Sequence, residues 1–172
     1  MQHSSSKVFL HPGEFCFTKN QSHIHTLLGS CISITLWHPR LHVGGMCHFT
    51  LPKYPGARSE DRKRDGRYAD DVMFMFQQEA IKNRTKLTEY EAKIFGGGNM
   101  MKSKGQNTED SIGTKNATAA MTLLMKENVD ILVAHVGEFG HRRIVFDTGS
   151  GNVWVRHIDN DGTRRESING KV

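Results

Sequence analysis

The chain has 172 residues, a formal net charge of +5 and a mean hydropathy of −0.52. This length suits one domain with its own core, and no apolar run approaches the ~20 residues that a membrane-spanning helix needs. Three cysteines without a CxxC spacing argue against a disulfide framework, and the N-terminal MQHSSSKVFL lacks the charged and apolar regions of a signal peptide. We therefore expect a cytoplasmic protein with reduced thiols and no membrane insertion.

The N-terminal part begins with a polar stretch, residues 1–7, which we expect to be disordered. The segment Val8–Phe17 then predicts a strand, a turn and a second strand, because His11-Pro12-Gly13 interrupts its apolar pattern. Cys16 lies between two phenylalanines in this segment, which is typical of a packing residue.

Two segments with β-strand patterns follow, and they are joined by a turn. Cys31–Trp37 alternates apolar and polar residues, His38-Pro39-Arg40 breaks the pattern, and Leu41–Phe49 resumes it. Strands rise ~3.3 Å per residue, so two arms of about seven residues run out and back by the same length. The pattern predicts a hairpin with Cys31 and His48 near its open end.

A thiol beside an imidazole is the minimum equipment of a cysteine-nucleophile enzyme. A free thiol is largely protonated at pH 7, and an adjacent imidazole that takes its proton makes it a nucleophile. A third group usually orients the imidazole. Thr26 is the nearest hydroxyl in the same arm as Cys31, and His25 and Ser30 compete with it for this role. The structural alternative is that Cys31 is a small core residue, as most single cysteines are.

Small residues surround both members of this pair. Gly29 precedes Ser30 and Cys31, and Gly44–Gly45 precede His48. Glycines let backbone approach a substrate or bend sharply, so Gly44 and Gly45 are predicted to form a loop near the substrate. Backbone N–H groups near Gly29, Ser30 and Cys31 are predicted to stabilise an oxyanion.

A loop rich in charged residues, Lys53–Arg67, is predicted to flank the site. Its basic residues are interrupted by Glu60, Asp61 and Asp65, a pattern that favours a solvated loop over a track for nucleic-acid phosphates. The alternative is a basic rim that steers an acidic protein partner to the site. We expect no nucleic-acid partner.

The second half of the chain mixes helical and β-strand patterns without strict alternation. Gly96–Asn99 follows a strand but lacks the Lys-Ser/Thr of a phosphate-binding loop, so its glycines, Gly97 among them, are predicted to allow close backbone approach near the site. Ser111 is predicted to cap a helix. The predicted elements are a helix over Tyr68–Arg84, a strand over Tyr90–Phe95, a helix over Asn116–Asn128, strands over Asp130–Val136, Arg142–Phe146 and Asn152–Ile158, and a polar tail over 159–172. This order predicts an α+β fold of mixed sheet with two or three helices.

The ten histidines raise the alternative of a metal site. No HExxH motif and no paired Cys/His spacing is present, so we expect neither a metal nor another cofactor.

Six segments, in order along almost the whole chain, resemble the chemoreceptor glutamine deamidases of bacterial chemotaxis, the CheD family. They are FLHPGEF at 9–15, LLGSC at 27–31, GGMCHFTLP at 44–52, RYADDVMFMF at 67–76, KIFGGGNM at 93–100 and SIGTKNATAAMTLL at 111–124. Several motifs in one order are far more specific than a single Cys–His spacing. The resemblance implies one deamidase-like domain over 8–158, built as a layered sandwich of two packed mixed β-sheets with two or three flanking helices.

The resemblance also implies an activity. Members of this family convert glutamine side chains of chemoreceptors to glutamate and release ammonia through a thioester, as part of chemotaxis adaptation. Their nucleophile falls on Cys31, their base on His48 and their third catalytic residue on Thr26, with His25 as the alternative if the loop length differs by one. The implied partners are the cytoplasmic domain of a chemoreceptor and a chemotaxis phosphatase. One departure is His135–His141, where the family tends to show Asp-Leu-Gly-Gly.

Overall fold

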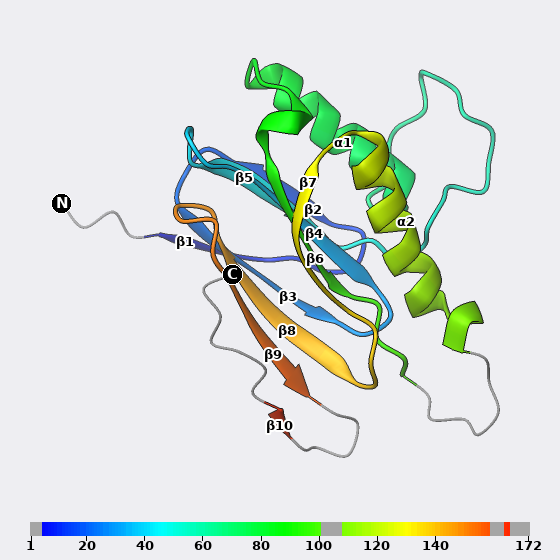
Figure 1. Ribbon diagram of the computed structural model, residues 1–172. Helices are drawn as coiled ribbons and strands as arrows, with labels where there is room; N and C mark the ends of the chain where they lie inside the picture. Colours follow the sequence, from blue (N-terminus) through cyan, green and yellow to red (C-terminus); the bar gives the residue numbers. More distant parts are fainter. Residues whose placement is uncertain (1–4, 101–107, 159–163, 166–172) are drawn as a thin grey trace.

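The computed structural model describes residues 5–100, 108–158 and 164–165 (Figure 1). In chain order the elements are β1 (Ser6–Phe9), β2 (Phe15–Thr18), β3 (Ser22–Leu28), β4 (Ile32–His38), β5 (Val43–Cys47), α1 (Ala69–Lys82), the short 3-10 helix η1 (Leu87–Glu89), β6 (Glu91–Gly96), the 3-10 helix η2 (Thr108–Asp110), α2 (Ile112–Lys126), β7 (Asp130–Val136), β8 (His141–Asp147), β9 (Val153–Ile158) and β10 (Arg164–Arg165).

The strands form two five-stranded sheets, ordered β1-β3-β8-β9-β10 and β2-β5-β4-β6-β7. Each sheet is mixed, because β1 pairs with β3 in parallel and β6 pairs with β7 in parallel while the other pairs are antiparallel. A hydrophobic core built from Ile24, Leu28, Met46, Phe95, Ile144 and Phe146 joins the inner faces of the two sheets. The two packed mixed sheets confirm the predicted fold class.

Both α-helices cover the outer face of the second sheet, which gives a sheet–sheet–helix layering (Figure 1). A second core forms there, because the alternation along β4 turns Ile32, Ile34 and Leu36 towards the helices. The other face of β4, which begins next to Cys31, turns towards the first sheet. The alternation that predicts the hairpin therefore also decides which side chains lie between the sheets.

The helix predicted over Tyr68–Arg84 is α1, which ends two residues earlier. The second helix begins four residues before the predicted start, with Ser111 as its N-cap: the Ser111 Oγ accepts a hydrogen bond from the Thr114 N–H at 3.1 Å. The sequence places this start too late because the first turn of the helix is largely polar and contains a glycine, so it carries no apolar periodicity.

The prediction that residues 1–7 are disordered is wrong for Ser6 and Lys7, which pair with β3 as the first residues of β1. Residues 1–4 lie outside the described part of the chain, as does the predicted polar tail apart from Arg164–Arg165. Within the ranges given above, no helix has the length and apolar character to span a membrane.

Candidate active site

Cys31 and His48 lie at the open end of the β4–β5 hairpin. The antiparallel register, with Thr35 opposite Met46, continues to a bridge in which Ile32 and Phe49 exchange N–H···O bonds of 3.0 and 2.9 Å. Because Ile32 and Phe49 point into the core beneath the helices, the flanking Cys31 and His48 point to the other face, towards the first sheet. His48 is then a diagonal cross-strand neighbour of Cys31, a spacing that side chains can bridge.

The His48 imidazole is held by Thr26, a fully buried residue of β3. The Thr26 Oγ1 lies 2.7 Å from the His48 Nδ1 and 2.8 Å from the Leu10 carbonyl oxygen. A hydroxyl has one proton and a carbonyl only accepts, so Thr26 donates to Leu10 and accepts from the Nδ1–H. This assignment, made from the hydrogen-bond network, leaves the Nε2 unprotonated as a base.

Thr26 does not lie in the same arm as Cys31, which corrects the expectation from the sequence. Its strand, β3, belongs to the first sheet, so the site spans both sheets. His25, the alternative third residue, points to the opposite face of β3 from Thr26, because neighbouring strand residues alternate.

Burial sets the protonation of the pair. It lowers the pKa of His48 to about 4 and raises the pKa of the Cys31 thiol, although the backbone N–H of Cys31 itself acts in the opposite direction on the thiol. Among the described residues, the buried Nε2 of His48 has no hydrogen-bond partner. The resting pair is therefore a neutral thiol and a neutral imidazole at pH 7.

The backbone of His48 is fixed by the turn between β1 and β2. The Gly13 N–H donates to the His48 carbonyl at 2.7 Å, and the His48 N–H donates to the Glu14 carbonyl at 3.1 Å. Gly13 has a φ of +86°, a backbone conformation that favours glycine. The Pro-Gly-Glu segment of the sequence therefore fixes the backbone from which the imidazole projects.

The Gly29–Cys31 segment is held from the other side by the glycines after β6. The Gly97 N–H donates to the Cys31 carbonyl at 2.9 Å, and the Gly98 N–H donates to the Gly29 carbonyl at 2.8 Å. A Cβ at Gly96 would collide with the Cys31 carbonyl oxygen. This is the close backbone approach that the sequence predicts for these glycines.

The chain resembles known proteins over nearly all of its length. A family model described as "CheD chemotactic sensory transduction" matches residues 50–157. A protein of Pseudomonas syringae pv. tomato is 37% identical over 162 residues, which cover 94% of this chain and 95% of that protein. The chain belongs to the CheD family.

Other family members match comparably well. A protein of Dechloromonas aromatica is 42% identical over 87% of this chain and 86% of its own length, and one of Leptospira interrogans is 35% identical over 86% of this chain and 90% of its own. All three carry the name "Probable chemoreceptor glutamine deamidase CheD", in two cases with a number. The match to the Pseudomonas protein covers 94% of this chain, so both Cys31 and His48 lie within the matched region.

Gly44 and Gly45 are not in a loop in this CheD family member. Both lie buried inside β5, where a Cβ at Gly44 would collide with the Leu36 carbonyl and one at Gly45 would come 2.5 Å from the Cys16 carbonyl oxygen. Their position between neighbouring strands explains why only glycine fits there, and it places them in the sheet rather than at its substrate-facing edge.

The other cysteines lie in different surroundings. The Cys47 Sγ is buried on the helix side of the sheet and accepts a hydrogen bond from the Ile34 N–H at 3.3 Å, and burial raises its pKa to about 12. Cys16 is partly buried in β2, where burial also raises its pKa. Neither thiol shares the position of Cys31 at the hairpin end.

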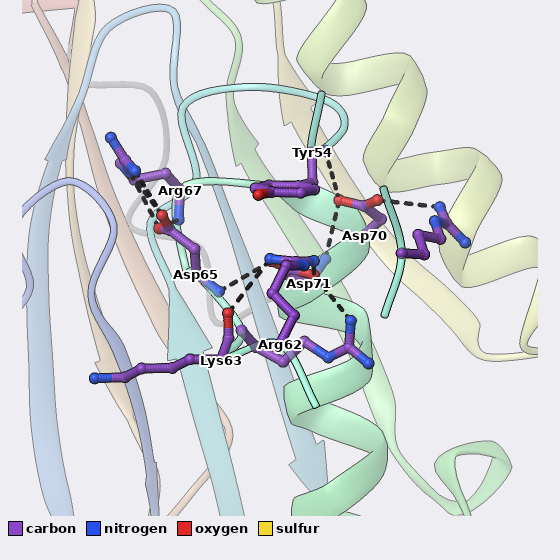
Figure 2. Close-up of polar contacts among 9 residues, drawn as sticks. Tyr54, Arg62, Lys63, Asp65, Arg67, Asp70 and Asp71 are labelled. Carbon is purple, nitrogen blue, oxygen red and sulfur yellow. Dashed lines mark hydrogen bonds and ion pairs between the residues drawn. The ribbon is translucent and has the colours of Figure 1, made fainter. Parts of the chain in front are cut away.

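The charged loop is anchored to the start of α1 instead of being fully solvated (Figure 2). The Arg62 guanidinium donates to the Asp71 carboxylate at 2.5 and 2.8 Å and lies 3.6 Å from the centre of the Tyr54 ring. Arg58 pairs with Asp70 at 3.0 Å. The predicted solvated loop is therefore wrong for Arg62, whose side chain is mostly buried, whereas Arg58 is paired but exposed, as are the loop residues 55–61 around it.

Asp71 is the centre of this anchor and is 2% exposed. Burial alone would raise the pKa of its carboxyl, but hydrogen bonds from Arg62 and from the Asp65 N–H outweigh burial and lower it. The carboxylate is therefore charged at neutral pH, and no sequence signal distinguished it from the other acidic residues nearby.

The atypical segment His135–His141 surrounds a fully buried arginine. Arg142 donates to the His135 Nδ1 at 2.8 Å, to the Gly137 carbonyl at 2.6 Å and to the Gly96 carbonyl at 3.1 Å. Burial lowers the pKa values of both His135 and Arg142. His135 thus accepts from Arg142 as a neutral imidazole, and the arginine connects this segment to the glycines behind Cys31.

Across residues 5–100, 108–158 and 164–165, no group of three His, Cys, Asp or Glu side chains is placed to hold a metal ion. The candidate site therefore consists of a thiol, an imidazole and a hydroxyl with backbone support.

Proposed function

We propose that this chain deamidates glutamine side chains of chemoreceptor cytoplasmic domains, converting them to glutamate with release of ammonia. The observation that carries the proposal is the His48 imidazole. Its Nδ1 is held by Thr26, while its Nε2, which has no partner among the described residues, lies on the same strand face as Cys31. The names of the relatives supply the substrate class. Adaptation in chemotaxis takes place in the cytoplasm, so the protein works there with a reduced thiol.

In the first half of the reaction, the His48 Nε2 takes the proton of the Cys31 thiol and the sulfur attacks the carbon of the glutamine side-chain amide. The negative charge that forms on the amide oxygen is stabilised by backbone N–H groups of the Gly29–Cys31 segment. When the C–N bond breaks, the His48 imidazolium gives its proton to the departing nitrogen, and ammonia leaves. The product is a thioester between Cys31 and the receptor.

In the second half, a water molecule attacks the thioester carbon. His48 takes a proton from this water as the C–O bond forms, and the C–S bond breaks as the proton returns to the sulfur of Cys31. The receptor side chain is now a glutamate. Thr26 accepts from the Nδ1–H throughout, so its hydrogen bond is strongest while the imidazolium exists.

Substrate docking is proposed for a groove beside the hairpin end. Lys53, Pro52 and Arg58 line it together with Lys115 and Thr118 of α2. Asp70 and Glu109 also line it, so the three basic side chains outnumber the acidic ones by one. Chemoreceptor cytoplasmic helices tend to be acidic, and the basic side chains of the groove attract them. Arg58 is already paired with Asp70, and Lys115 lies 3.7 Å from the Asp110 carboxylate, so the attraction falls mainly on Lys53 and in part on Lys115.

The test is ammonia release from a receptor fragment with the Cys31→Ala variant as the critical comparison. Cys16→Ala is the matched control, because it removes a partly buried thiol outside the site. We expect the control to keep its activity and Cys31→Ala to lose it. Full activity of Cys31→Ala, or insensitivity of the wild type to iodoacetamide, would refute the mechanism.

Binding to a chemotaxis phosphatase is a separate prediction. A pulldown of the phosphatase with wild type and with Cys31→Ala distinguishes a binding-only role from an enzyme. If both proteins capture the phosphatase equally and the wild type deamidates no receptor, the binding role is favoured. A screen of small amides tests the remaining alternative, an amidase with a free small-molecule substrate.

A further inference from the structure

Asn116, on the first turns of α2, is fully buried behind the nucleophile segment. Its Nδ2 donates to two backbone carbonyls, to Ser30 at 3.1 Å and to Thr50 at 2.9 Å. Two carbonyl partners fix the orientation of the amide, because only the nitrogen end can donate. The helix thereby connects the two arms of the hairpin.

The two carbonyls lie where the β4–β5 ladder ends. Ile32 and Phe49 form its last bridge, and the next cross-strand pair in this register is Cys31 opposite Thr50. In an antiparallel ladder this pair makes no backbone bond, and the next rung would join Ser30 to Leu51. The Leu51 N–H donates to the Arg67 carbonyl instead, at 3.0 Å, and the Ser30 carbonyl accepts from Asn116. Without the Asn116 amide, the Ile32–Phe49 bridge alone would join the two strands at the end that carries Cys31.

The bond to Ser30 has a further consequence, because the Ser30 carbonyl and the Cys31 N–H belong to one planar peptide group. In a trans peptide the two point in opposite directions, so fixing the carbonyl towards α2 fixes the direction of the N–H. That N–H also acts to lower the pKa of the Cys31 thiol, against the larger effect of burial. In the described part of the chain it donates to no backbone carbonyl.

From this geometry we infer that Asn116 is a positioning residue for the oxyanion site, holding the Ser30–Cys31 peptide so that its N–H faces the oxygen of the attacked amide. The inference rests on the proposed function. A hydrogen bond to the carbonyl also polarises the peptide and strengthens its N–H as a donor. The Oδ1 of Asn116 is buried without a hydrogen-bond partner among the described residues, which is costly, so the position is poorly explained by stability alone.

The test compares two reactions of Cys31 that differ in their need for an oxyanion site. Deamidation passes through a tetrahedral oxyanion, whereas alkylation by iodoacetamide is a substitution at a saturated carbon and forms none. In Asn116→Ala we expect kcat for a receptor fragment to fall about tenfold or more, with KM and the alkylation rate within about twofold of wild type. Asn83→Ala is the matched control, because the Asn83 Nδ2 also donates to a backbone carbonyl, that of Glu79 at 2.7 Å, at the far end of α1.

A second variant, Asn116→Asp, has nearly the same volume but presents acceptors to both carbonyls. We expect its kcat to be low at neutral pH and to recover partly as the pH is lowered, because a protonated carboxyl can donate one of the two bonds. Unchanged kcat in Asn116→Ala, equal losses of deamidation and alkylation, or failure of both variants to fold would overturn the role assigned to Asn116. A wild type that releases no ammonia would refute the proposed function itself.

Discussion

Replacing Thr26 with valine tests the proposed orientation of His48. Valine keeps the shape of threonine but removes the hydroxyl that links the His48 Nδ1 to the Leu10 carbonyl, at 2.7 and 2.8 Å. A neutral hydrogen bond contributes about 1 kcal/mol and one to a charged group about 1.5–3 kcal/mol. Because only the gain on forming the imidazolium affects the chemical step, the loss is about 1–2 kcal/mol, or about 5- to 30-fold in kcat.

The assay is steady-state ammonia release from a receptor fragment by wild type, Thr26→Val and Thr26→Ser. Serine keeps the hydroxyl and is expected to keep most of kcat, while KM stays close to wild type in both variants. His25→Ala, on the opposite face of β3, is expected to retain full activity. If Thr26→Val keeps more than half of the wild-type kcat, or if His25→Ala loses more activity than Thr26→Val, the assigned orientation of the imidazole is incorrect.

Four further predictions follow from the charges of the molecule. Burial lowers the pKa of His48 to about 4, so kcat/KM should hold down to about pH 5 and fall with an apparent pKa near 4; an acid limb near the ordinary histidine value would contradict this. Because of the same shift, His48 binds a proton in the unfolded chain at a pH where the native imidazole stays neutral. The free energy of unfolding should therefore fall by up to about 3 kcal/mol as the pH drops from 6.5 to 4. Urea unfolding of His48→Asn should not show this pH-dependent loss. Asp71→Asn weakens three hydrogen bonds at a buried position and should destabilise the fold by about 2 kcal/mol, measured by urea unfolding at pH 7, whereas equal midpoints would show that the anchor contributes nothing. Lys53→Glu combined with Lys115→Glu should raise KM for an acidic receptor fragment with kcat unchanged, an effect that shrinks at high salt; an unchanged KM would remove the groove from the docking surface.

Much of the fold could be predicted because apolar periodicity determines which faces are buried. The alternation Ile32, Ile34, Leu36 predicts both the strand and its buried face, and the three- and four-residue spacing of apolar residues predicts α1 to within two residues. The start of α2 could not be predicted from the same signal, because its first turn holds a glycine, two polar residues and one exposed apolar residue, Ile112. Helix-capping chemistry at Ser111 was the better guide there.

The site could be predicted only in part, because its members meet through tertiary contacts. The hairpin brings Cys31 and His48 to one face by local register, which the sequence reveals. Thr26 comes from the other sheet, so its approach to His48 depends on how the sheets pack and not on its distance from Cys31 in the sequence. Asn116 gave no signal beyond its place in a helix, since a buried amide that donates to two backbone carbonyls is visible only once the helix is docked.

The most direct test of the account is mass spectrometry of a receptor fragment incubated with the protein in H₂¹⁸O. We predict that the wild type converts particular glutamines to glutamates that carry one ¹⁸O, because water opens the thioester, and that Cys31→Ala converts none. Conversion by Cys31→Ala at the wild-type rate, or no conversion by the wild type, would contradict the central claim that Cys31 and His48 deamidate receptor glutamines.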